Sequence, residues 1–244
     1  MRIEDYPPQE PLSPAGQAYA GECMQRGAGV VASVEARFGA DPYQSAAVYR
    51  AAKPNGAVYV FWHGGGWTSG YKEHMAFMAP VFAAAGVTFV TPGYRLAPQH
   101  LFPAQFEDCA DAVGWVHANA ARFGADPARI FLGGHSAGGH YAALLAVTQG
   151  WRRKRGLPAH VVRGCIPISG VYQFGGGTGF AMRPRFLGPE SAATDRAASP
   201  IHQIEGVPPP FLIAYGEKDF PHLIPQAEAM AAALKNAGGE VETI

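Results

Sequence analysis

The stretch that most constrains this chain is "LGGHSAGGH", residues 132–140, in which one serine lies among four glycines. Gly134, Ser136 and Gly138 fit the pattern G-x-S-x-G, with a short apolar run before it and a helical pattern after it. A sharp strand-to-helix turn of this kind strains the backbone at the serine, and side chains two positions to either side would collide. The pattern therefore predicts an α/β fold that lifts Ser136 above the carboxyl edge of a parallel sheet.

Apolar runs and helical patterns alternate along most of the chain. We expect strands at residues 57–62, 87–91, 129–133, 161–169, 210–215 and 240–244, and helices at 17–38, 73–85, 106–123, 137–145 and 225–237. Buried strands that alternate with amphipathic helices indicate a mostly parallel central sheet with helices on both faces. We expect residues 1–244 to form a single domain of this kind, since 244 residues suffice for one.

Two segments depart from this alternation. Residues 1–40 are expected to form an N-terminal arm, the first sixteen of them rich in proline and polar groups and draped over the surface. Residues 173–203 contain "FGGGTG" and several arginines and prolines without a clear period. About thirty irregular residues inside a compact domain are typical of a lid or binding loop, although an ordinary surface excursion explains them equally well.

Composition excludes several classes of function. Nineteen basic side chains balance nineteen acidic ones, so nothing favours nucleic acid or an anionic membrane surface as a partner. The one basic run, "WRRKRG" at residues 151–156, is expected to be a solvated helix end. Three scattered cysteines form neither a metal motif nor a disulfide framework. The N-terminus has no apolar signal-peptide core and no apolar run would span a membrane, so we expect a cytoplasmic protein; the oligomeric state is open.

A second glycine-rich stretch, "HGGGW" at residues 63–67, follows the expected strand 57–62. Glycines leave backbone N–H groups unobstructed, so that a substrate oxyanion can approach them closely. The expected oxyanion hole consists of the N–H groups of Gly65 and Gly66, joined by that of Ala137 after the serine. We expect the His63 ring to hold this loop in place and Trp67 to be a packing residue.

"HGGGW", "YRLAPQHLFPAQFEDC" and "GHSAGGH" stand in an order that resembles the α/β-hydrolase fold, and within it the hormone-sensitive-lipase-like esterases. The resemblance runs from about Val58 to the C-terminus and implies hydrolysis of carboxylic esters with modest acyl chains, without a cofactor or a metal. Gly93 before "YRLAP" and His135 before the serine depart from that group. "GHSAGGH" is also similar to arylformamidases (kynurenine formamidases) and to feruloyl-esterase-like enzymes, so an N-formyl aryl amide is an alternative substrate to an ester.

The catalytic acid in this fold comes from a loop after the serine in chain order. Asp219, in "AYGEKDF" behind the expected strand 210–215, matches the acid position of the family. Its role would be to orient an imidazole and to stabilise that ring when it is charged. Glu217 is the competing carboxylate, and Asp219 could instead cap the following helix.

The catalytic base is harder to assign, although the chain has nine histidines. The two histidines of "LGGHSAGGH" are expected to leave the turn in other directions. In the family, the histidine follows one more helix and one more strand, which places it just past residues 240–244. We therefore expect the chain to be incomplete at its C-terminus and the base to lie beyond Ile244, with His222 as the fallback and His202 as a further alternative.

The resulting expectation is a serine hydrolase that acts on short-chain or aryl esters through an acyl-enzyme intermediate. Ser136 would be the nucleophile and Asp219 the acid, and the partner would be a small-molecule ester or formamide. From a different class, the chain could be a non-catalytic ligand-binding protein on the hydrolase scaffold, as plant gibberellin receptors are.

Overall fold

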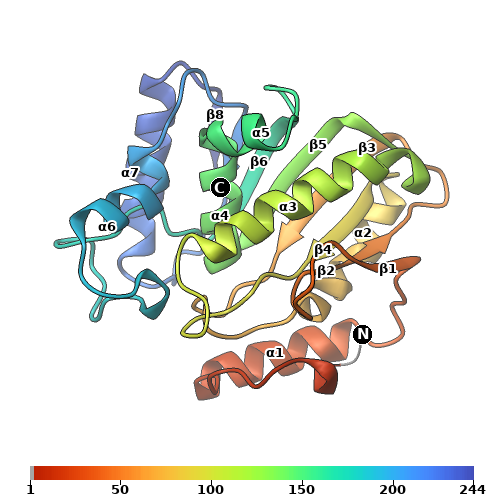
Figure 1. The fold of residues 1–244 in the computed structure, drawn as a ribbon, viewed down its shortest axis with the longest axis horizontal. Helices are drawn as coiled ribbons and strands as arrows, with labels where there is room; N and C mark the ends of the chain where they lie inside the picture. Colours follow the sequence, from red (N-terminus) through yellow and green to blue (C-terminus); the bar gives the residue numbers. More distant parts are fainter. Residues whose placement is uncertain (1–2) are drawn as a thin grey trace.

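A computed structural model describes residues 3–244, and its centre is one eight-stranded sheet with the strand order β1-β2-β4-β3-β5-β6-β7-β8 (Figure 1). The strands are β1 (Val34–Arg37), β2 (Ser45–Tyr49), β3 (Gly56–Trp62), β4 (Thr88–Pro92), β5 (Ala125–His135), β6 (Val162–Ile168), β7 (Phe211–Ile213) and β8 (Val241–Thr243). β1 pairs with β2, and β2 with β4, in antiparallel fashion; all later pairs are parallel. The predicted fold class, a mostly parallel sheet flanked by helices, is confirmed.

Helices follow most of the parallel strands. The α-helices are α1 (Pro14–Arg26), α2 (Ala79–Ala84), α3 (Ala104–Asn119), α4 (Ala137–Val147), α5 (Gly150–Lys154), α6 (Ala192–Ala198) and α7 (Leu223–Asn236). Short 3-10 helices are η1 (Ile3–Asp5), η2 (Lys72–Met78), η3 (Ala120–Phe123), η4 (Arg185–Leu187) and η5 (Pro200–His202).

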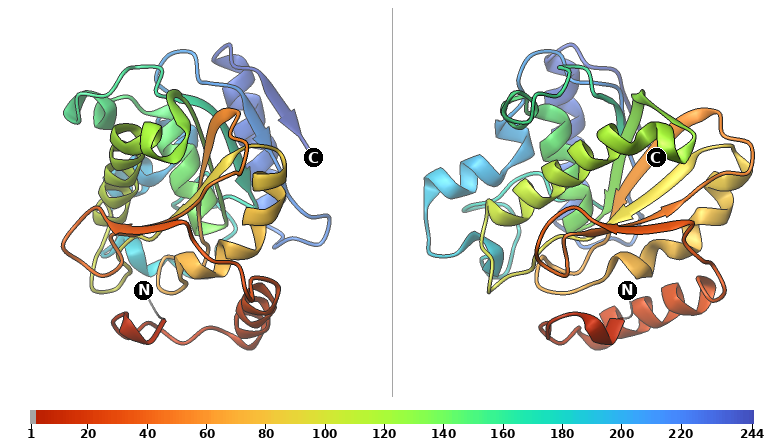
Figure 2. Two further views of the ribbon diagram at one scale, coloured as in Figure 1. Left: turned by 90° about the vertical axis from the view of Figure 1, so that its right-hand side faces the viewer. Right: turned by 45° about the vertical axis from the view of Figure 1, so that its right-hand side comes forward.

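The sheet has an apolar core on each face, because successive side chains of a strand point to opposite sides. In β3, Val58 and Val60 belong to one core, and Tyr59 and Phe61 to the other. The first core is closed by α3, α4 and α7, and the second by η2, α2 and the inner side of α1 (Figure 2). All residues of α4 are buried, which explains why this helix lacks a polar face. The carboxyl end of β5 thus leads directly into a helix that is buried along its whole length.

The N-terminal part differs from the expectation. The helix predicted at 17–38 is wrong in its second half, because α1 ends at Arg26 and the glycines at 27 and 29 break the period. Residues 34–37 alternate in burial and form the edge strand β1, which pairs with β2. The helix predicted at 73–85 begins as the 3-10 helix η2 and becomes α-helical only at Ala79.

Two further segments need correction. Residues 173–203, expected to be irregular, contain η4, α6 and η5. The basic run 151–156 is not a fully solvated helix end: the Arg152 guanidinium is buried and donates to the carbonyl oxygens of Leu145 and Ala146 at the C-terminus of α4. Burial lowers the pKa of Arg152 to about 10. Its charge stabilises the negative end of the α4 dipole, which is the one part of the expectation that holds.

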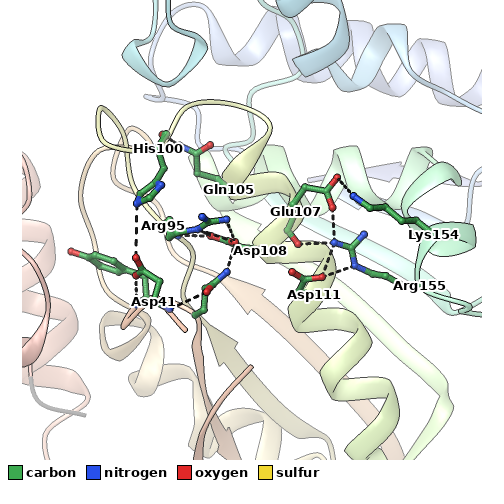
Figure 3. A network of polar contacts seen from close by, with 11 residues as sticks. Asp41, Arg95, His100, Gln105, Glu107, Asp108, Asp111, Lys154 and Arg155 are labelled. Carbon is green, nitrogen blue, oxygen red and sulfur yellow. Dashed lines mark hydrogen bonds and ion pairs between the residues drawn. The ribbon is translucent and has the colours of Figure 1, made fainter. Parts of the chain in front are cut away.

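The turn after β4 is fastened to α3 by a buried ion pair (Figure 3). Asp108 is fully buried and accepts from the backbone N–H and the guanidinium of Arg95, and from the Gln44 side-chain amide. A buried charge needs such full pairing to be tolerated. The "YRLAP" turn, the loop before β2 and α3 are thereby held at one point.

Candidate active site

Ser136 occupies a strained turn between β5 and α4, with φ of 53° and ψ of −115°. A Cβ on Gly134 would lie under 3.0 Å from the backbone of Gly138, and a Cβ on Gly138 would lie equally close to the carbonyl oxygen of Trp62. Real side chains do not reach such distances. The prediction that this turn requires glycine on both sides of a strained serine is confirmed.

The glycine loop after β3 passes directly beside this serine. Trp62 and Gly134 are register partners in the parallel pair β3–β5, so the residues that follow them leave the sheet as neighbours. A Cβ on Gly64 would lie 3.1 Å from the Cβ of Ser136, which shows how closely the two backbones approach. A Cβ there would also lie 3.0 Å from the His135 carbonyl oxygen, so this position favours glycine.

Hydrogen bonds fix the orientation of two peptide groups in the glycine loop. The Gly64 carbonyl oxygen accepts from Nδ1 of His63 at 2.7 Å. The Gly65 carbonyl oxygen accepts from the backbone N–H groups of Thr68 and Ser69 and from the Ser69 hydroxyl, at 3.2, 3.0 and 2.9 Å. In a trans peptide the N–H points opposite to the C=O, so the N–H groups of Gly65 and Gly66 point away from these donors.

The N–H groups of Gly65 and Gly66 have no hydrogen-bond acceptor among residues 3–244. The N–H of Ala137 belongs to the first turn of α4, where no intrahelical acceptor is available. The structure therefore leaves three unpaired donors on the two backbone segments that flank Ser136.

His63 holds the loop from inside, as expected. Its ring stacks on Tyr94 with centroids 4.5 Å apart, and the Tyr94 hydroxyl donates to the His63 carbonyl oxygen at 3.0 Å. Burial lowers the pKa of His63 to about 3, so the ring is neutral, and donation from Nδ1 identifies the proton-bearing nitrogen. Its Nε2 is buried and has no partner within the described chain.

Trp67 and His140 form a packed pair, which confirms Trp67 as a packing residue. The Trp67 ring is buried and stacks on Phe186, with centroids 4.3 Å apart. Its Nε1 donates to Nδ1 of His140 at 3.1 Å, and Nε2 of His140 donates to the Ala198 carbonyl oxygen at 2.7 Å. Both ring nitrogens of His140 are thus used in the core, and burial lowers its pKa to about 3.

Asp219 lies in the loop after β7, within electrostatic reach of the serine turn. Burial lowers the pKa of His135, the residue before the serine, and the Asp219 charge opposes this shift. Oδ1 of Asp219 accepts from the Phe220 N–H at 2.9 Å, whereas Oδ2 is buried and finds no partner in residues 3–244. The carboxylate does not cap α7, which begins at Leu223. The competing Glu217 is exposed to solvent.

No histidine of the described chain hydrogen-bonds to Ser136 or Asp219. The His222 ring packs on Phe180 with centroids 4.5 Å apart and lines a hollow of about 330 Å³ to which Ser136 does not contribute. His202 is exposed and has Nε2 3.4 Å from the Gln173 amide. Neither alternative base is brought to the serine.

A neutral cavity of about 500 Å³ opens over Ser136. Its walls come from the glycine loop, from the turn of Ser136, and from one side of α1 with the residues before it. The lining side chains include Leu12, Tyr19, His135 and Phe220. Among the described residues, no Asp, Glu, Lys or Arg side chain lines this cavity. None of residues 173–203 lines it. The contribution of α1 to the cavity was not predicted from the sequence. The one available signal is that Ala15, Gly16, Tyr19 and Ala20 recur at helical spacing and so share one side of the helix.

Within residues 3–244, no group of three or more His, Cys, Asp or Glu side chains is arranged to hold a metal ion. The described helices include none that is long and apolar enough to cross a membrane.

Comparison with known proteins finds relatives that are named as esterases. Esterase LipQ of Mycobacterium tuberculosis is 32% identical over 192 residues, which are 72% of this chain and 45% of LipQ. Carboxylesterase NlhH of the same species is 41% identical over 95 residues, which are 38% of this chain and 30% of NlhH. The chain thus spans less than half the length of these curated relatives.

Solved structures share the fold. The carboxylesterase EstE1 from a metagenomic library superposes with a TM-score of 0.76 at 24% identity, over 93% of this chain and 84% of EstE1. The esterase of Pyrobaculum calidifontis gives 0.76 at 24% identity, over 96% of this chain and 88% of that protein. Residues 59–244 match the model of a family described by the alpha/beta hydrolase fold. The chain therefore belongs to the α/β-hydrolase fold family.

Proposed function

We propose that this chain is a carboxylic ester hydrolase with Ser136 as its nucleophile. The observation that carries the proposal is the strained serine turn beside a glycine loop in which hydrogen bonds to the Gly64 and Gly65 carbonyl oxygens orient two unpaired N–H groups. Strain of this kind persists where the surrounding structure enforces it, and it clusters at active sites. The names of LipQ and NlhH, an esterase and a carboxylesterase, point to the same chemistry.

In this proposal Ser136 Oγ attacks the ester carbonyl carbon while an imidazole base removes the hydroxyl proton. The N–H groups of Gly65, Gly66 and Ala137 stabilise the negative charge that develops on the carbonyl oxygen. The base then gives its proton to the departing alcohol, which leaves an acyl group on Ser136. Water, deprotonated by the same base, attacks this acyl group and restores the serine.

The acid of this proposal is Asp219, and its base is a histidine beyond Ile244, with His222 as the alternative. Support comes from the buried Oδ2 of Asp219, an acceptor that has no donor in residues 3–244. The Ile244 N–H and C=O bond to Ile213 and Tyr215, at the strand end that leads to the Asp219 loop. The backbone at Ile244 therefore runs beside β7, the strand whose end leads into the Asp219 loop.

The proposed substrates are neutral short-chain or aryl esters. The cavity of about 500 Å³ has no charged side chain in its wall, so an anionic acyl group would find no counter-charge. A series of 4-nitrophenyl acetate, butyrate and octanoate, run beside N-formylkynurenine, separates the ester from the formamide substrate. Turnover of the formamide but of no ester would replace the proposed substrate class.

The decisive experiment measures ester turnover by the chain and by Ser136→Ala, with and without added imidazole. Turnover that depends on Ser136 and rises with imidazole supports the proposed nucleophile and a base supplied from outside residues 3–244. Turnover that needs no imidazole and is lost in His222→Ala assigns the base to His222. Ligand binding without turnover, under both conditions, would favour the non-catalytic binding protein. In its support, no histidine within residues 3–244 hydrogen-bonds to Ser136.

A further inference from the structure

The segment Tyr6–Glu10, called the N-terminal strap below, crosses the outer side of the glycine loop. The Gln9 side-chain amide pairs with both peptide groups of Gly70: its Nε2 donates to the Gly70 carbonyl oxygen at 2.8 Å, and its Oε1 accepts from the Gly70 N–H at 2.7 Å. The Glu10 N–H donates to the Thr68 carbonyl oxygen at 3.4 Å. The strap thus bonds to the loop much as a neighbouring strand would.

Gly70 in turn backs the peptide that presents the first oxyanion donor. It has a φ of 108°, and a Cβ there would overlap the Gly64 carbonyl oxygen and Nδ1 of His63. These are the two atoms whose hydrogen bond orients the Gly65 N–H. A shift of Gly70 is therefore transmitted to the His63–Gly64 contact without any intervening side chain.

The strap has its own anchor in the protein interior. Tyr6 is buried between the rings of Tyr43 and Tyr71, with centroids 5.0 and 5.1 Å away. Its hydroxyl accepts from the buried Lys72 ammonium at 2.9 Å and donates to Glu73 at 2.9 Å. These buried hydrogen bonds, together with the two ring contacts, fix the strap at one end.

The strap is held at two more residues, Pro7 beside Tyr6 and Glu10 at the far end. The Tyr43 hydroxyl donates to the Pro7 carbonyl oxygen at 2.9 Å, and Glu10 forms an ion pair with Arg185. Gln9 thus lies between two fixed points, so its amide approaches Gly70 with little freedom to turn away.

From these contacts we infer that Gln9 is a positioning residue for the oxyanion hole, a role that rests on the proposed hydrolase function. Gln9 touches no reacting atom. It holds Gly70, which holds Gly64 and His63, and these set the direction of the Gly65 N–H. The strap therefore positions the glycine loop, although it lies more than fifty residues before that loop in the sequence.

The first test compares Gln9→Ala with Gln25→Ala, which removes an exposed amide elsewhere in the N-terminal region. Loss of one oxyanion donor lowers kcat by about 100-fold to 1,000-fold, and misorientation forfeits part of this. We expect kcat for a 4-nitrophenyl ester to fall about tenfold to 100-fold in Gln9→Ala, with KM within about twofold. Gln25→Ala should match the unsubstituted protein. A kcat of Gln9→Ala within twofold of that protein would overturn the inference.

A second variant, Gln9→Glu, separates positioning from general destabilisation. A protonated carboxyl group has one donor and one acceptor and can replace the amide pairing, whereas a carboxylate has acceptors only. The kcat of Gln9→Glu relative to the unsubstituted protein should rise as the pH falls toward about 5, near the ordinary pKa of glutamate. A ratio that does not change with pH would contradict the role.

Amide hydrogen exchange gives a readout that does not depend on catalysis. In Gln9→Ala, the N–H of Gly70 should exchange faster, together with the glycine loop around it, while β3 and β5 keep their protection. Unchanged exchange in the loop would overturn the inference even if activity fell. Absence of esterase activity in the unsubstituted protein would count against the proposed function alone, because the exchange data still decide whether Gln9 orders the loop.

Discussion

Gly138, in the first turn of α4, lies against the carbonyl oxygen of Trp62 at the end of β3, so closely that a Cβ would overlap that oxygen. Gly138→Ala should therefore force α4 away from β3 and lower the free energy of unfolding by about 1–3 kcal/mol. Urea denaturation at neutral pH measures this change. Gly21→Ala in α1, where a Cβ meets nothing within 4 Å, is the matched control and should stabilise by about 0.5–1 kcal/mol. Equal stability of both variants would show that the turn tolerates a side chain.

The buried pair Arg95–Asp108 should matter far more than the exposed pairs of the same network (Figure 3). Asp108→Ala leaves the Arg95 guanidinium and the Gln44 amide without their acceptor. The free energy of unfolding should fall by about 3 kcal/mol. This is the lower end of the range for a broken buried pair, because Arg95 is partly solvated. Lys154→Ala removes an exposed partner of Glu107 and should cost less than about 1 kcal/mol. Thermal or urea unfolding of both variants decides the comparison.

Stability should fall on acidification because buried histidines stay neutral in the folded protein. Burial lowers the pKa of His140 from 6.5 to about 3, so the unfolded chain binds more protons between these values. The free energy of unfolding therefore decreases as the pH falls below 6.5, by about 1.4 kcal/mol per pH unit for such a histidine. His63 adds a similar contribution.

The contribution of His140 is measured by how steeply the free energy of unfolding changes with pH, and not by its value at one pH. His140→Phe should be less stable at pH 7, because Trp67 Nε1 and the Ala198 carbonyl oxygen lose their partner. Its unfolding free energy should nevertheless depend on pH by about 1.4 kcal/mol per unit less than that of the unsubstituted protein between pH 6 and pH 4. His160→Phe, at an exposed site, serves as the control. Equal slopes for His140→Phe and the unsubstituted protein would mean that His140 is protonated in the folded state.

Asp219 and Glu217 lie in one loop and should differ sharply in their effect on turnover. Loss of the orienting carboxylate costs about 10⁴ in kcat in a complete triad. Asp219→Asn should lower kcat at least 100-fold, on the order expected for this role, under the imidazole condition that gives the fastest turnover. Glu217→Gln, at an exposed position, should change kcat less than about twofold. The reverse order of effects would assign the acid to Glu217.

Local rules explain why the centre of the molecule was predictable. The run before Ser136, the glycines around it and the apolar helix after it each satisfy a requirement that lies within about fifteen residues. The same holds for the glycine loop behind β3. The predicted parallel strands accordingly appear in the sheet, with boundaries displaced by a few residues.

Features that depend on distant contacts were not predictable. β2 consists largely of small residues, and its burial results from pairing with β4, forty residues away. In the sequence, Arg152 is one of several neighbouring cations, and only the folded structure shows that it contacts the C-terminus of α4. The position of α1 over Ser136, and the pairing of Gln9 with Gly70, depend on where the N-terminal segment docks, which no local pattern specifies.

Covalent labelling shows directly whether Ser136 is a nucleophile. The chain is incubated with a fluorophosphonate, with and without imidazole, and the adduct is located by intact mass and peptide mapping. We expect one phosphonyl group on Ser136, formed faster with imidazole, and none in Ser136→Ala. An unlabelled Ser136 under both conditions, or an adduct that persists in Ser136→Ala, would contradict the role of Ser136 as the nucleophile.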